Sequence, residues 1–195
     1  MKQELIAGVD EVGRGPLAGP VCAAAVILKP GFINTFGITD SKKLTEQKRE
    51  ELYDIIIENS LAWAVEMVDI DIIEEINILQ ATQRAMHNAI NSLKIKPDYL
   101  KIDGNYFIDM GIPFETIVKG DLKELVISCS SILAKVTRDR WMIEVADKLY
   151  PQYLFAKNKG YGTAEHIKAI EKYGICPIHR KSFLHNILYP QLEIF

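Results

Sequence analysis

The sequence predicts an α/β fold in which a mixed β-sheet is covered on both sides by helices. Two observations support this prediction: apolar segments with strand patterns come first, and further strands then alternate with helical segments. The chain has 195 residues, of which 48% are hydrophobic, so it has enough apolar material for one core. We therefore expect one compact unit, with a main domain over residues 1–150 and a helical cap over residues 151–195.

Five segments have the composition of β-strands. A turn-rich link joins the first two, which favours a hairpin or another tight return. Short apolar runs bounded by turn residues are typical of strands that are buried in a sheet. The predicted strands cover residues 4–10, 20–29, 61–69, 98–103 and 114–119.

Helices are predicted between and after these strands. One begins after Thr45, which is a suitable N-cap with acidic residues in the following turn. Another covers residues 77–94, because apolar residues with helical spacing lie on one face there, and Pro97 ends it. Residues 122–148 are largely helical, and short helical pieces follow Pro151.

Cysteine usage and hydropathy exclude several classes of protein. Cys22, Cys129 and Cys176 lie far apart and form no CxxC pair, which argues against a structural zinc site or a disulfide framework. The first residues show no secretory signal, and the longest uncharged run, residues 15–28, is too short to span a bilayer. We expect a cytoplasmic protein without membrane contact, and a monomer, because no interface stripe is visible.

Charge is unevenly distributed along the chain. The formal net charge is −3, yet residues 157–181 contain six Lys or Arg against two Glu. A basic segment on an acidic body is typical of a surface that contacts phosphates. A solvated helix face has the same pattern, so charge alone leaves both interpretations open.

Four carboxylates follow predicted strands. Asp10 and Glu11 close the first strand, Asp103 closes the fourth, and Asp121 comes after the fifth. The ends of neighbouring parallel strands line the ligand crevice of an open sheet, so we expect these side chains to converge. Clustered carboxylates repel one another unless a cation lies among them, and Mg²⁺ or Mn²⁺ prefers such oxygen ligands. Two such ions can hold the attacking and leaving oxygens of a phosphodiester.

Each carboxylate also has a simpler interpretation. Neighbouring residues in a strand point to opposite faces, so Glu11 shares a site with Asp10 only if the strand ends or bulges there, and otherwise it faces solvent. Asp103 precedes a glycine, as in many turns. Asp121 and Glu124 have the spacing of a capping box at the start of a helix.

Six motifs occur in an order and at a spacing that resemble type 2 ribonuclease H, the ribonuclease HII family. They are "DEVGRG" (10–15), "DSKKL" (40–44), "KIDG" (101–104), "GD" followed by "SSILAKVTRDRWM" (120–142), "NKGYGTAEH" (158–166) and "PIHRKSF" (177–183). The resemblance implies a ribonuclease H-like five-stranded mixed sheet flanked by helices, with a small C-terminal helical part. One departure is "VISCSS" where such enzymes are usually Ala-rich, but these residues are still small enough for close packing.

The resemblance implies metal-dependent cleavage of RNA in RNA/DNA hybrids, and cleavage on the 5′ side of single ribonucleotides in DNA. It implies in-line attack of water with two metal ions, which leaves 5′-phosphate and 3′-hydroxyl ends. The metal-binding carboxylates of the family fall on Asp10, Glu11, Asp103 and Asp121, with Mn²⁺ or Mg²⁺ as the cofactor. The alternatives are an integrase-type enzyme, which also clusters carboxylates, and a non-catalytic hybrid-binding protein.

Substrate contacts are expected at several places. The resemblance puts the family's Gly-Arg-Gly on Gly13, Arg14 and Gly15, and its substrate-sensing tyrosine on Tyr161. Glycines allow close backbone approach to a nucleotide, and paired backbone groups can distinguish a 2′-hydroxyl from hydrogen. Phosphate contacts are expected at further residues, with surface solvation as the alternative for each. These residues are Ser41, Lys42, Lys43, Arg180 and Lys181.

Three further features have competing interpretations. Lys135, Arg138 and Asp139 lie on a predicted helix, where pairing among them is the simplest account. His179 either donates to a phosphate or satisfies local hydrogen bonds. The last residues, "QLEIF" (191–195), resemble the peptide with which bacterial replication and repair proteins dock on the sliding clamp, and the simpler account is that this tail packs on its own domain.

Overall fold

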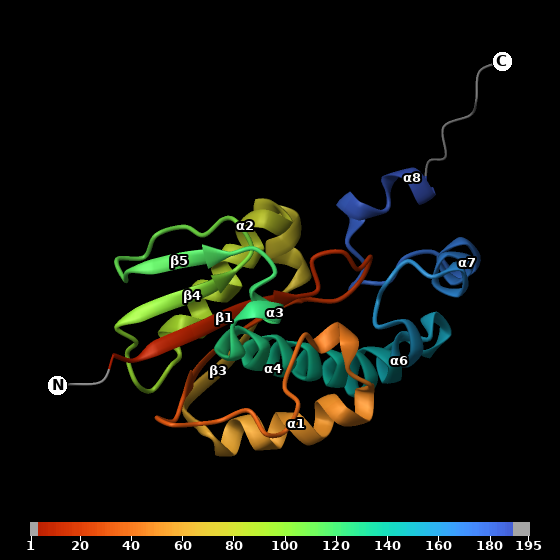
Figure 1. The fold of residues 1–195 in the computed structure, drawn as a ribbon. Helices are drawn as coiled ribbons and strands as arrows, with labels where there is room; N and C mark the ends of the chain where they lie inside the picture. Colours follow the sequence, from red (N-terminus) through yellow and green to blue (C-terminus); the bar gives the residue numbers. More distant parts are fainter. Residues whose placement is uncertain (1–3, 189–195) are drawn as a thin grey trace.

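A computed structural model describes residues 4–188, with the exception of the Asn186 side chain. The fold is a five-stranded mixed sheet in the order β3-β2-β1-β4-β5, flanked by helices (Figure 1). β1 lies at its centre, antiparallel to β2 and parallel to β4. This arrangement confirms the predicted fold class. The strands are β1 (Ile6–Val12), β2 (Val21–Leu28), β3 (Ser60–Val68), β4 (Tyr99–Asp103) and β5 (Phe114–Ile117).

Strand β2 is buried on both faces, which explains its continuous apolar sequence. Its odd-numbered residues from Val21 to Ile27 belong to the core that packs against α2 (Ile70–Asn91). Its even-numbered residues from Cys22 to Val26 belong to the core under α1 (Glu46–Glu58) and α4 (Leu125–Trp141). The sheet therefore separates two apolar cores, and helices cover both of its faces (Figure 1).

Helix α2 begins earlier than residue 77, where the apolar periodicity placed its start, and it is interrupted at Asn77. The backbone of Asn77 is not helical, with φ 67° and ψ 165°. Its side-chain oxygen accepts the N–H groups of Leu79 and Gln80, so it caps the piece that follows. The spacing of the apolar residues predicts only this second piece, and residues 70–76 form a first piece that was not predicted.

The start of α1 follows the prediction, because the Thr45 hydroxyl accepts the N–H of Lys48 and caps the helix. On the same side of the sheet, α4 lies unusually close to β1. A Cβ atom on Gly8 would lie 2.4 Å from the carbonyl carbon of Val126, so only glycine permits this approach. The small residues of α4 are thus compatible with close packing on the sheet, as expected.

The predicted helix over residues 122–148 is divided into pieces. α3 (Gly120–Lys123) ends at Glu124, whose backbone is extended with φ −124° and ψ 115°. After α4, a π-helical segment (Met142–Ala146) leads into α5 (Asp147–Leu149). The break at Glu124 lets its carboxylate reach Lys101 of β4, at 2.7 Å from the ammonium nitrogen.

Short helices follow Pro151, as predicted. Tyr153, Phe155 and Leu184 form a small third core, which also includes Ala18 from the link between β1 and β2. In Figure 1 this link reaches away from the sheet toward α6 and α7. The pieces are a 3₁₀ turn (Pro151–Tyr153), α6 (Phe155–Asn158), α7 (Ala164–Tyr173), a second 3₁₀ turn (Lys181–Phe183) and α8 (His185–Leu188).

None of the helices within residues 4–188 has the length and hydropathy that a membrane span requires. The three cysteines are free and buried. Burial raises the pKa of the Cys22 and Cys129 thiols to about 12, so neither is a nucleophile at neutral pH. The tail at residues 191–195, with its proposed clamp peptide, lies outside the described residues.

Candidate active site

Three of the predicted carboxylates lie together beside the end of β4. Oxygen atoms of Asp10, Glu11 and Asp103 are all within 4.8 Å of one another. Asp10 is buried, and the other two side chains are half-buried. The alternative in which Glu11 simply faces solvent is therefore wrong.

The convergence does not require β1 to end, although we expected the strand to end or bulge at Asp10. β1 continues to Val12 and keeps its regular pairing with β2. Its pairing with β4, however, stops at Val9 and Ile102. Within residues 4–188, no strand pairs with β1 on its β4 side beyond that point. The next two side chains of β1 can therefore both reach the carboxylate that ends β4.

Burial and mutual repulsion dominate the electrostatics of this group. Burial raises the pKa of Asp10 well above its ordinary value, and the charges of Glu11 and Asp103 raise it further. Burial also raises the pKa of Glu11, while the guanidinium of Arg14 opposes that shift. Burial and repulsion therefore disfavour the ionised forms of Asp10 and Glu11 unless a cation lies beside them.

The donor set fits a hard divalent cation. All three side chains offer oxygen, and no histidine or cysteine belongs to the group. Carboxylate oxygens are the ligands of Mg²⁺ and Mn²⁺, whereas zinc sites are usually built from nitrogen and sulfur. A bound cation would also relieve the repulsion that raises the pKa of Asp10.

Asp121 lies close to this group but not within it. It belongs to α3, and the N–H groups of Gly120 and Asp121 donate to one carboxylate oxygen of Asp103, at 2.7 and 3.4 Å. Burial raises its pKa, and the charges of Asp103 and Asp40 add to the shift. The capping-box alternative is wrong, because Lys119 is the N-cap and α3 ends at Glu124.

Two buried arginines hold the link between β1 and β2, residues 13–20. Arg180 donates to the carbonyl oxygens of Gly13, Arg14, Pro16 and Gly19, at 2.7–3.1 Å. Arg138 donates to the carbonyls of residues 18, 20 and 159. Both side chains have zero solvent exposure. Two buried guanidinium groups thus hold the backbone of the link from the interior of the protein.

These contacts correct two predictions. Arg180 is not available to a phosphate at the surface, because it is fully buried and its donors are occupied by carbonyl oxygens. Arg138 does not pair along its helix but supports the residue 13–20 link. Lys135 does pair with Asp139, at 2.8 Å, as the helical spacing predicts.

The two glycines of the Gly-Arg-Gly motif have different surroundings. Gly13 has φ +93°, and a Cβ there would lie 2.4 Å from Nε of Arg138. At Gly15 a Cβ would meet no atom within 4 Å. Between them, the side chain of Arg14 is 52% exposed and lies 3.4 Å from the carboxylate of Glu11. Gly13 therefore serves the fold, and Gly15 and Arg14 are open to a ligand.

The other predicted phosphate contacts differ in exposure. Lys42 is 82% exposed, and its ammonium nitrogen lies 3.9 Å from Asp121. Lys43 and Lys181 are exposed. Ser41 is buried and its hydroxyl is hydrogen bonded to that of Ser131, at 3.0 Å. Ser41 consequently anchors this loop to α4, and the lysines that follow it remain accessible.

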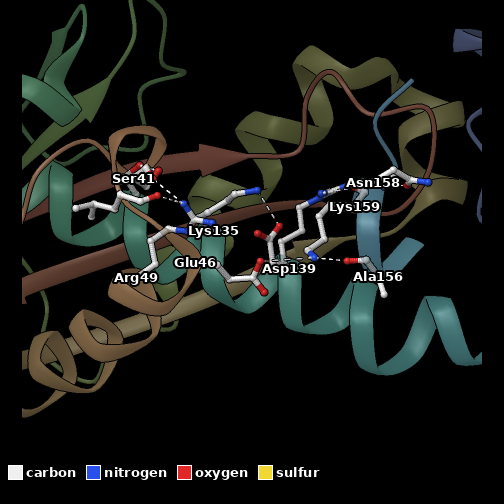
Figure 2. A network of polar contacts seen from close by, with 12 residues as sticks. Ser41, Glu46, Arg49, Lys135, Asp139, Ala156, Asn158 and Lys159 are labelled. Carbon is white, nitrogen blue, oxygen red and sulfur yellow. Dashed lines mark hydrogen bonds and ion pairs between the residues drawn. The ribbon is translucent and has the colours of Figure 1, made fainter. Parts of the chain in front are cut away.

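Tyr161 is 40% exposed and lies beside two cations. The ammonium of Lys135 and the guanidinium of Arg138 are 5.8 and 5.9 Å from its ring centroid. Figure 2 shows a polar network whose labelled side chains include those from α1, α4, α6 and the residue after α6, Lys159. Glu46 of α1 pairs with Lys159, whose ammonium also donates to the carbonyl of Ala156. The C-terminal part is thereby fixed against the main sheet domain.

Some residues that shape the site gave little signal in the sequence. His179 is 2% exposed, and its ring nitrogens are hydrogen bonded to His166 and to the backbone of Cys176, which supports the simpler of its two interpretations. Asp40 caps the 3₁₀ turn Ser41–Lys43 by accepting the N–H of Lys42, and it faces Asp121. Its position directly before "SKK" was the available signal, since Asp is a common N-cap.

Comparison with known proteins decides the family. A sequence model described as Ribonuclease HII matches residues 7–186. The chain belongs to the ribonuclease HII family. The ribonuclease HII of Caldicellulosiruptor bescii is 56% identical over 183 residues, which are 94% of this chain and 88% of that relative. The ribonuclease HII of Acetivibrio thermocellus is also 56% identical, over 95% of this chain and 72% of the relative.

Solved structures agree with this assignment. The crystal structure of ribonuclease H2 from Pyrococcus horikoshii OT3 matches with a TM-score of 0.76 and 28% identity, over 93% of this chain and 96% of that one. Ribonuclease HII from Archaeoglobus fulgidus, solved as a complex with PCNA, matches with a TM-score of 0.79 and 24% identity, over 98% and 100% of the two chains. The second match shows the fold alone. As a ribonuclease HII, the chain is an endoribonuclease and a hydrolase.

Proposed function

We propose that this ribonuclease HII hydrolyses the RNA strand of RNA/DNA hybrids and cuts duplex DNA on the 5′ side of a single embedded ribonucleotide. Asp10, Glu11, Asp103 and Asp121 hold Mn²⁺ or Mg²⁺, and the products carry 5′-phosphate and 3′-hydroxyl ends. The observation that carries this proposal is the group of three carboxylates within 4.8 Å beside the Gly-Arg-Gly link.

The carboxylates provide a charged site that accepts cations in place of protons. Burial raises the pKa of Asp10, and a bound cation would favour its ionised form. Asp103 is oriented by the N–H groups at the start of α3, which leaves its second oxygen for the site. When bound, two divalent ions stabilise the charge on the attacking and leaving oxygens during in-line attack of water.

Asp121 is the fourth proposed metal ligand, and it lies beside the group formed by the other three carboxylates. It is 6% exposed, and Lys42 balances part of its charge. Asp121 would help to hold a second cation, whose charge would balance that of Asp121 in place of Lys42, and Lys42 could then bind a phosphate of the substrate. Lys43 and Lys181 are exposed and add to the same phosphate-binding surface.

Selection of ribonucleotides falls to the exposed part of the link and to Tyr161. Backbone groups around Gly15 approach the sugar, because no Cβ intervenes, and the 2′-hydroxyl can both donate and accept there. Arg14 binds a phosphate after leaving Glu11. Tyr161 stacks on the sugar or base from the C-terminal part. We thus propose that residues 151–195 act as a cap on residues 1–150 and contribute to substrate binding.

The experiment uses three duplexes with Mn²⁺ or Mg²⁺: an RNA/DNA hybrid, DNA with one ribonucleotide, and all-DNA of the same sequence. The proposal expects cleavage of the first two, with the cut 5′ of the single ribonucleotide, and no cleavage of the third. The Tyr161→Ala variant is expected to lose more activity on the single-ribonucleotide duplex than on the hybrid. Equal inactivity on the last two duplexes would refute the ribonucleotide incision, and strand joining would favour an integrase-type enzyme.

A further inference from the structure

A chain of hydrogen bonds connects the carbonyl of Tyr161 to two buried histidines. Nδ1 of His166 lies 2.9 Å from the carbonyl oxygen of Tyr161. Nε2 of His166 lies 3.0 Å from Nε2 of His179. Nδ1 of His179 in turn lies 2.9 Å from the backbone nitrogen of Cys176. The chain therefore runs from one backbone group to another through two imidazole rings.

The two backbone groups at the ends allow one proton arrangement. A carbonyl oxygen can only accept, so Nδ1 of His166 carries a proton and its Nε2 accepts. His179 must then donate from Nε2, which leaves its Nδ1 as an acceptor. The backbone N–H of Cys176 can only donate, and it meets that acceptor. Both rings are thus neutral, and each nitrogen has a complementary partner.

The surroundings of the pair exclude an additional proton. His166 is completely buried and His179 is 2% exposed. The groups that face the pair are the rings of Tyr153 and Phe155 and the thiol of Cys176. Burial lowers the pKa of both histidines, and that of His179 falls to about 4. A proton added to Nε2 of His166 would face the N–H at Nε2 of His179 at 3.0 Å, and one added to Nδ1 of His179 would face the backbone N–H of Cys176 at 2.9 Å.

Hydrogen bonds hold the backbone of Tyr161 on both sides of its Cα atom. Its N–H donates to the carbonyl of Asn158, and its own carbonyl accepts from the N–H of Thr163 as well as from His166. The tyrosine itself lies between two glycines, which allow the backbone many conformations. These hydrogen bonds are what restricts it to one.

We infer that His166 and His179 are positioning residues for Tyr161, and that the neutral pair fixes the backbone from which the tyrosine ring meets the ribonucleotide. The inference rests on the proposed function, because it assumes that Tyr161 contacts the substrate. His166 acts directly on the Tyr161 carbonyl. His179 acts one step further away, because its Nε2–H holds His166 in the tautomer that donates.

The test is a double-mutant cycle between His166 and Tyr161. His166→Phe keeps a ring among aromatic neighbours but removes the donor to the Tyr161 carbonyl, whereas His166→Asn keeps a donor at the place of Nδ1. kcat/KM is measured on the single-ribonucleotide duplex, with and without Tyr161→Ala. His166→Phe is expected to lower kcat/KM about fivefold to tenfold when Tyr161 is present and less than about twofold when it is absent. His166→Asn is expected to recover most of the loss.

Equal losses from His166→Phe in both backgrounds, or no recovery with His166→Asn, would overturn the inference and leave the proposed function standing. Unchanged cleavage by Tyr161→Ala alone would overturn the inference and the substrate contact proposed for Tyr161, but would leave the proposed hydrolysis standing. If His166→Phe shows no cooperative melt, the same cycle is run with His179→Phe, which leaves the Tyr161 contact of His166 in place. A loss from His179→Phe that disappears in the Tyr161→Ala background supports the inference, and an additive loss overturns it.

Discussion

Replacing Gly13 by alanine is expected to destabilise the protein, while the same change at Gly15 is not. At Gly13 the added Cβ would lie 2.4 Å from Nε of Arg138 and 2.8 Å from the carbonyl oxygen of Pro20. Overpacking of this kind costs about 2 kcal/mol, and a side chain at φ +93° costs about 2 kcal/mol more. The sum of about 4 kcal/mol corresponds to a fall in Tm of about 8–16 °C.

Thermal unfolding in metal-free buffer measures this effect, with Gly15→Ala as the matched control. A Cβ at Gly15 meets no atom within 4 Å, so the stability of that variant should stay within about 1 kcal/mol of the wild type. Its cleavage of the single-ribonucleotide duplex should nevertheless fall, because the methyl group obstructs backbone approach to the sugar. Equal Tm values for the two variants would show that Arg138 does not pack against Gly13 as described.

Three further outcomes are expected. Asp10→Asn should abolish cleavage and raise Tm in metal-free buffer, because it replaces a buried carboxyl group, whose ionisation burial and Glu11 oppose, by a neutral amide whose oxygen can still accept the Glu11 N–H; a lower Tm would contradict this account. The pKa of His179 is about 4 in the folded protein against an ordinary 6.5, so the unfolded chain binds the proton more tightly. The free energy of unfolding should therefore fall by up to about 3 kcal/mol between pH 6.5 and 4, and less in His179→Phe; denaturant titrations at several pH values that show parallel curves would refute this. Lys42→Ala should leave Tm unchanged, because its pair with Asp121 is exposed at the lysine, but should reduce the salt dependence of hybrid binding by about one phosphate contact; an unchanged slope in binding titrations would remove Lys42 from the interface.

The sequence predicted the sheet and most of its helices because their signals are local. β2 is apolar throughout, and Thr45 stands before a helical pattern, so each could be recognised without knowledge of its neighbours. The convergence of Asp10 and Asp103 was also predictable, because Asp103 ends β4 and Asp10 lies just beyond the last residue of β1 that pairs with this parallel strand. Here the predicted fold class indicated which strands lie next to each other, which the local sequence alone does not show.

The roles of the buried charges were not predictable in the same way. Nothing near Arg180 in sequence distinguishes a residue that binds carbonyls inside the protein from one that binds phosphates outside it. That choice depends on four carbonyl groups more than 160 residues away along the chain. The break at Asn77 was also not predictable, because a kink within an apolar helical pattern leaves the spacing of the apolar residues almost unchanged.

The buried arginines also determine which way the peptide planes of the link face. A peptide group is planar and trans, so a carbonyl that points to one side sends the following N–H to the other. The carbonyl oxygens of Gly13 and Arg14 both point toward Arg180. The amide hydrogens of Arg14 and Gly15 must then point away from it, with the positive ends of two peptide dipoles aligned. An interior cation thus orients two N–H groups at the surface in a way that suits an anion, without contributing any atom of its own to that arrangement.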